Sequence, residues 1–144
     1  MKKLALAFSL VVCFTMMVNA QIIEELWTAA QLMETKELAT KIENKEADKM
    51  LIISIGPDAV VKGSVNIGAT HDAHNLDKLK NYLKDVPKDK QIVIYCGCCP
   101  FSRCPNIRPA FKLMMDLGFK NTKLLNVPHN IKTDWIDHDY PTED

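Results

Sequence analysis

Four cysteines lie close together in one short segment of the sequence. Cys96, Cys98, Cys99 and Cys104 all lie within a span of nine residues. A disulfide inside so short a loop would remove little chain entropy and add little stability. Buried cysteines often act as small apolar fillers, but four of them beside Gly97 and two prolines are not typical of a core segment. The clustering therefore indicates thiol chemistry or metal binding rather than a disulfide scaffold.

This cysteine segment offers two features that lower the pKa of a thiol. Arg103 lies within it, and a helix is expected from Ile107 with Asn106 as its N-cap. A cationic side chain and a helix N-terminus both favour the thiolate, which is the nucleophilic form. Backbone N–H groups in such a loop can also hold an anion. Together these features favour attack on the sulfur of a small anionic donor, which leaves a persulfide on the cysteine.

The elements around the cysteine segment indicate how it is positioned. Apolar, β-branched runs predict strands at residues 50–55, 65–67, 91–95 and 123–127. Helical spacing predicts a helix from Thr28 that carries Ala30, Leu32 and Met33, then a break near 34–36, after which Leu38, Ala39 and Ile42 continue the helical spacing; further helices are predicted at 76–83, 107–117 and about 135–136. This alternation predicts an α/β fold, a parallel sheet flanked by helices on both faces. Ligands bind beyond the carboxyl ends of such strands, where the cysteine segment follows strand 91–95.

The N-terminus has the pattern of a secretory signal peptide. Lys2 and Lys3 precede an apolar run at 4–18, and small residues precede Gln21. The run is short for a membrane span, so we expect residues 1–20 to be removed, with no stable membrane insertion afterwards. We therefore expect an exported protein, periplasmic or extracellular, with a single domain at 21–144 and a core at about 28–141. The whole sequence has 18 basic and 18 acidic residues; removal of Lys2 and Lys3 with residues 1–20 leaves 16 basic and 18 acidic residues, a net charge of 16 − 18 = −2, which does not favour a nucleic-acid partner.

The chain from about 28 to 141 resembles rhodanese-like domains, the sulfurtransferase family. The resemblance rests on a buried strand ending in Tyr95-Cys96, the loop after it, a helix ending in Leu117-Gly118-Phe119, the strand at 123–127, Trp135 and Tyr140-Pro141. The stretch at 61–69, with its two glycines and a short strand, also resembles the family. Ser54-Ile55-Gly56 stands where the family usually has an Asp-Val-Arg-like triplet. The resemblance implies a single rhodanese-like domain with a parallel sheet.

The same resemblance implies a set of catalytic residues. Cys96 corresponds to the family nucleophile that opens the loop after the central strand. The family's usual spacing from cysteine to arginine is met by Cys98 and Arg103, so the choice of nucleophile stays open. We expect Arg103 and loop N–H groups to bind a donor such as thiosulfate or a persulfide, and Cys98 or Cys99 to receive or resolve the sulfur. A thiol acceptor protein would take the sulfur onward, and no cofactor is expected.

Two other functions compete with sulfur transfer. Cys96 and Cys99 form a Cys-x-x-Cys pair, with Cys104 as a resolving thiol, which would suit a thiol–disulfide or redox-sensing protein in an oxidising compartment. The four cysteines, with His129 nearby, could instead hold zinc or copper(I). Adjacent Cys98 and Cys99 fit a single tetrahedral site poorly.

The remaining histidines are weaker candidates. His71 and His74 are expected to be exposed loop residues. His129 follows the strand at 123–127 and so ends on the loop side of the sheet, where it either tunes a thiolate or occupies a turn.

Overall fold

The computed structural model describes residues 27–143. The expected signal peptide at residues 1–20 lies outside the described residues. Within residues 27–143, no helix is long and apolar enough to cross a membrane.

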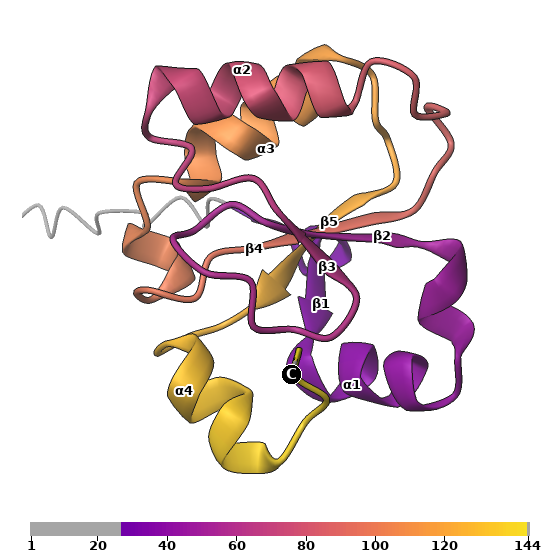
Figure 1. The fold of residues 1–144 in the computed structure, drawn as a ribbon, viewed down its shortest axis with the longest axis vertical. Helices are drawn as coiled ribbons and strands as arrows, with labels where there is room; N and C mark the ends of the chain where they lie inside the picture. Colours follow the sequence, from indigo (N-terminus) through magenta and orange to yellow (C-terminus); the bar gives the residue numbers. More distant parts are fainter. Residues whose placement is uncertain (1–26, 144) are drawn as a thin grey trace, which may run out of the picture.

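A five-stranded parallel sheet is the centre of the described chain (Figure 1). Its strands are β1 (Leu32–Glu34), β2 (Leu51–Ser54), β3 (Ser64–Asn66), β4 (Ile92–Tyr95) and β5 (Thr122–Asn126). Their order across the sheet is β1-β5-β4-β2-β3, and β4 is bonded to β2 on one side and to β5 on the other. The strand that precedes the cysteines is therefore the central one.

Helices cover both faces of this sheet, which confirms the predicted α/β architecture. They are α1 (Thr35–Glu43), α2 (Ala73–Tyr82), α3 (Ile107–Asp116) and α4 (Ile131–Asp134). Figure 1 shows α2 and α3 on one side of the sheet and α1 and α4 on the other. Short 3₁₀ helices at Ala29–Gln31, Glu46–Lys49, Phe101–Arg103 and Ile136–His138 complete the described elements.

The alternation of side chains along β4 decides where the first cysteine points. Ile92 and Ile94 pack into the core on the α2 and α3 side, whereas Val93 and Tyr95 pack into the core on the α1 and α4 side. Successive side chains of a strand point to opposite faces. Cys96 continues this alternation and is buried in the α2 and α3 core at 1% exposure.

The helix predicted from Thr28 is wrong at Leu32 and Met33. These residues form β1, which pairs in parallel with β5 through Leu32 beside Leu124 and Met33 beside Leu125. A single 3₁₀ turn precedes the strand, and α1 begins only at Thr35. Spacing alone does not separate a three-residue strand from part of a helix, and here the free edge of β5 favours the strand.

The loop after β2 is held at the carboxyl end of the central strand by the hydroxyl of Tyr95. This oxygen accepts hydrogen bonds from the backbone N–H groups of Val60 (2.9 Å) and Val61 (3.1 Å) and bonds to the hydroxyl of Ser64 (2.9 Å). The residue that ends the central strand thus orders a second loop at the same edge of the sheet.

Candidate functional site

Two backbone hydrogen bonds, at Gly97 and at Phe101, join the cysteine segment to the chain that follows β5. The carbonyl of Gly97 accepts a hydrogen bond from the N–H of Ile131 (3.0 Å), and the N–H of Phe101 donates to the carbonyl of Val127 (3.1 Å). A Cβ added to Gly97 would lie 2.8 Å from Cβ of Ile131, so only glycine fits this approach to α4. The loop is therefore held against the carboxyl end of β5 and the start of α4.

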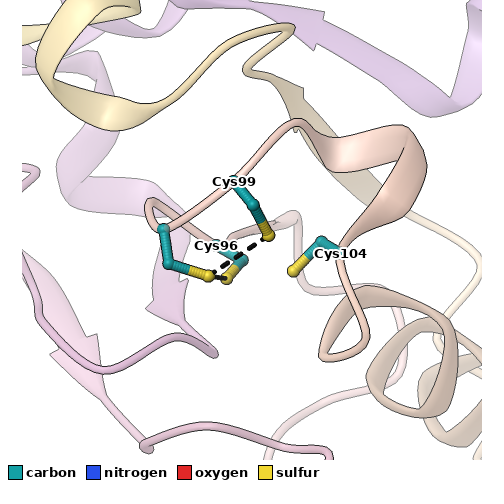
Figure 2. A group of neighbouring side chains, drawn as sticks. Cys96, Cys99 and Cys104 are labelled. Atoms are coloured by element: carbon teal, nitrogen blue, oxygen red, sulfur yellow. Dashed lines mark hydrogen bonds between the residues drawn. The ribbon is translucent and has the colours of Figure 1, made fainter.

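The four cysteine side chains converge on one point. Their sulfur atoms all lie within 4.8 Å of one another, and Figure 2 shows the thiols of Cys96, Cys99 and Cys104 turned toward one another. Sγ of Cys98 is 3.3 Å from Sγ of Cys96 and 3.3 Å from Sγ of Cys99. All four are free thiols; Cys96 and Cys104 are buried, Cys99 is half-buried and Cys98 is exposed.

The side chain of Asn106 contacts the buried sulfur directly. Its Nδ2 donates to Sγ of Cys96 at 3.3 Å. Its Oδ1 accepts from the backbone N–H of His71 (2.9 Å) and bonds to His71 Nδ1 (2.8 Å). Because Oδ1 already faces these two groups, the NH₂ group must face the sulfur. The hydroxyl of Thr70 also donates to the carbonyl of Asn106 (2.7 Å), which holds the two segments together.

The structure gives Asn106 and His71 roles that the sequence did not predict. Asn106 stands at the N-cap position of α3, but its side chain makes no capping hydrogen bond and serves Cys96 instead. His71 is exposed as predicted, yet its ring orients Asn106 and so belongs to the site. Neither role could be read from local sequence, since the two residues are 35 positions apart.

The surroundings shift the pKa values of these thiols in opposite directions. The pKa of Cys96 is lowered to about 5, first by the thiol of Cys104 donating to its sulfur, then by Asn106 and Cys98, while burial opposes the shift. The pKa of Cys98 is raised to about 12, first by partial desolvation of its sulfur within the cluster and then by the thiols of Cys99 and Cys96, although part of the side chain stays exposed. The pKa of Cys104 is raised because its thiol donates to Cys96 and is buried. Negative charge in this cluster is therefore concentrated on Cys96.

Three N–H groups of the loop are bonded to carbonyl groups of the chain and do not face a bound anion. The N–H groups of Arg103 and Cys104 donate to the carbonyls of Pro100 and Phe101, because the chain forms a 3₁₀ turn there. The N–H of Phe101 is also bonded elsewhere, while the backbone of Cys98 helps to stabilise the Cys96 thiolate. Arg103 is exposed and makes no ion pair with another residue of the described range.

His129 is not among the groups that converge on the cysteines. Its Nδ1 lies 2.8 Å from Oδ1 of Asp134, and its backbone N–H donates to the other carboxylate oxygen (2.7 Å). Among residues 27–143, the group able to hold a metal consists of the four cysteines alone. The structure thus places His129 in a turn that is ordered by Asp134.

The loop after β2 closes the site on another side. A Cβ added to Gly56 would lie 3.0 Å from Sγ of Cys96. Ser54, at the start of the triplet that differs from the family, donates its hydroxyl to the carbonyl of Asp58 (2.7 Å). This triplet contributes no charge beside the sulfur, so the polar contacts of Cys96 come from Asn106 and the other cysteines.

Solved structures share this fold at low sequence identity. The single-domain sulfurtransferase RDL2 of Saccharomyces cerevisiae is 20% identical, covers 77% of this chain and 92% of its own, and has a TM-score of 0.54. The Alr3790 protein of Anabaena sp. is 16% identical, with 77% and 90% coverage and a TM-score of 0.55. A persulfide form of an EanB variant with ergothioneine is 17% identical, with a TM-score of 0.54; the match covers 77% of this chain and 27% of EanB.

No protein-family model and no curated protein matches the sequence. The architecture nevertheless confirms the resemblance noted from the sequence: the chain has a rhodanese-like single-domain fold with a cysteine-rich loop after its central strand.

Proposed function

We propose that this protein carries out sulfurtransferase-type chemistry, with Cys96 as the residue that accepts a sulfane sulfur. The observation that carries the proposal is the buried sulfur of Cys96 at the carboxyl end of the central strand, with the Asn106 amide donating to it at 3.3 Å. This position is where parallel α/β sheets bind ligands. The rhodanese-like fold and the lowered pKa of Cys96 support the same assignment.

The first chemical step transfers one sulfur atom from a small anionic donor such as thiosulfate. The Cys96 thiolate attacks the sulfane sulfur, a new S–S bond forms, and the S–S bond of the donor breaks as sulfite leaves with the electron pair. Negative charge then resides on the outer sulfur of the persulfide. The neighbouring thiol of Cys104 and the hydrogen bond from Asn106 both lower the pKa of the sulfur that bears charge before the attack, which keeps Cys96 ionised near neutral pH.

The second step passes the outer sulfur to an acceptor thiol. The acceptor thiolate attacks the outer sulfur, and the Cys96 thiolate leaves and is regenerated. Cys98 and Cys99 are proposed to receive or resolve the sulfur, because Cys98 lies 3.3 Å from both Cys96 and Cys99. Arg103 is proposed to attract the donor anion through its exposed guanidinium.

The close contact between Cys96 and Cys98 supports a second candidate, a thiol–disulfide protein. If Cys98 attacks the inner sulfur of the persulfide, a Cys96–Cys98 disulfide forms and hydrogen sulfide leaves. An exported protein would meet an oxidising compartment where such a disulfide persists. Export itself is proposed from the sequence alone, and a mature N-terminus at Gln21 would support it.

One experiment tests the assignment. Reduced protein is incubated with thiosulfate, and the thiols are then alkylated and mapped by mass spectrometry. We expect one added sulfur on Cys96, its loss in Cys96→Ser, and wild-type labelling in Ser102→Ala, which changes an exposed residue of the same loop. Cyanide should then remove the sulfur as thiocyanate. Added sulfur on Cys98 or Cys99 in Cys96→Ser, at the wild-type yield, would contradict the role of Cys96, and a disulfide without any persulfide would favour the second candidate.

A further inference from the structure

The arrangement of the four sulfurs matches the size of a metal site. A tetrahedral ion with Zn–S bonds of about 2.3 Å places its sulfur ligands about 3.8 Å apart. In this structure two of the S···S distances are 3.3 Å and all of them are within 4.8 Å. Small side-chain rotations would therefore bring all four sulfurs to equal distances from one central ion.

The adjacent cysteines do not prevent this arrangement. From the sequence, Cys98 and Cys99 fit a single tetrahedral site poorly, because neighbouring side chains often point apart. Here the chain bends at these residues, and their sulfur atoms lie 3.3 Å from each other on the same side of the loop. The other two ligands come from the end of β4 and from the residue after the 3₁₀ turn.

We propose that Cys96, Cys98, Cys99 and Cys104 together bind one thiophilic d¹⁰ cation, Zn²⁺ or Cu⁺. Four sulfur donors with no oxygen donor among them select soft or borderline ions rather than Mg²⁺ or Ca²⁺. Asn106 supplies the outer hydrogen bond that metal-bound thiolates require, because its amide already donates to Cys96 and is oriented by His71. Two ligands are buried and two are accessible, so an ion can enter from the side of Cys98 and Cys99.

The bound ion would also regulate the proposed sulfur transfer. Coordination withdraws negative charge from the sulfur of Cys96 and crowds it with three other ligands, so it weakens the attack of this sulfur on a donor. A loaded protein should therefore form the persulfide more slowly than the metal-free protein does. This consequence rests on the proposed function, whereas the metal site itself does not.

The test measures metal binding directly, without a sulfur donor. Reduced full-length protein, purified without a histidine tag, is titrated with Co²⁺ as a spectroscopic probe and then with Zn²⁺. Parallel titrations with Cu⁺ against a chelator rank the two ions. We expect one ion per chain and, with Co²⁺, the intense visible bands and thiolate charge-transfer absorption of a tetrahedral sulfur site.

Two variants and one control make the result specific. Cys99→Ser changes a half-buried ligand and leaves the core intact, so the affinity should fall by at least about 100-fold. Cys104→Ala removes a buried ligand and should have a similar effect, while Ser102→Ala should bind as the wild type does. Absence of a bound ion at stoichiometric metal, or wild-type affinity in Cys99→Ser, would overturn the site. Binding without any persulfide formation in the metal-free protein would overturn only the proposed function.

Discussion

Removing the amide of Asn106 is the most direct perturbation of the site. The side chain gives Cys96 a hydrogen bond at 3.3 Å from a nearly fully buried position. A hydrogen bond to a charged group contributes about 1.5–3 kcal/mol, and one pKa unit corresponds to about 1.4 kcal/mol. Asn106→Ala should therefore raise the pKa of Cys96 by about 1–2 units, from about 5 to about 6–7. At pH 6 the thiolate fraction should fall from about nine tenths to between about one tenth and one half.

The ultraviolet absorbance of the thiolate, followed against pH, measures this shift without requiring access to the buried sulfur. The step that disappears in Cys96→Ser belongs to Cys96. Asn106→Asp keeps the shape of the side chain but replaces the donor with a carboxylate, so it should raise the pKa of Cys96 further than alanine does. His71→Ala should give a smaller rise, because the backbone N–H of His71 still holds Oδ1.

Circular dichroism and thermal unfolding must show that each variant is folded before its titration is interpreted. The backbone carbonyl of Asn106 still accepts the hydroxyl of Thr70 in every variant, so the two segments stay joined. A folded Asn106→Ala protein whose Cys96 step moves by less than about 0.3 units would refute the reasoning, since less than about 0.4 kcal/mol would then come from the amide.

Three further predictions concern stability. Because the pKa of Cys96 is lowered in the folded state, its ionisation stabilises the fold fully above about pH 9, and this contribution is lost as the pH falls toward about 5. The free energy of unfolding in urea should therefore fall with decreasing pH over that range, and Cys96→Ser should make this dependence flatter. Gly97→Ala should lower the free energy of unfolding by about 1–3 kcal/mol, because the new Cβ would lie 2.8 Å from Cβ of Ile131; an unchanged denaturation midpoint would show that the loop yields freely. Tyr95→Phe leaves the backbone N–H groups at 60–61 without their acceptor and should lower the free energy of unfolding by about 2–4 kcal/mol in denaturant titration; an unchanged midpoint would contradict this role of the hydroxyl.

Most of the fold could be predicted because its central strands and main helices are visible as apolar patterns in the local sequence. The apolar β-branched residues of β2 and β4 are buried on both faces, which makes each strand a continuous run in the sequence. The stripe Ile107, Ala110, Phe111 and Met114 is buried along α3, and Gly118 adopts φ of 84° after it, as a residue beyond a helix C-terminus does. β1 could not be predicted in this way, because three residues of strand depend on an edge offered by β5, some 90 positions later.

Local patterns along the chain were enough to predict thiols at the carboxyl end of a central parallel strand, because apolar alternation, turn residues and cysteine spacing are all properties of neighbouring residues. Which of these thiols is ionised, and which groups stabilise its charge, depends on contacts that form only in the folded chain. The contacts of Cys96 with Asn106, and of Asn106 with His71, join segments that the sheet and α3 bring together, and hydrogen bonds of this kind depend on positions in space rather than on neighbours along the chain. The same convergence turned two adjacent cysteines toward each other and drew four sulfurs within 4.8 Å.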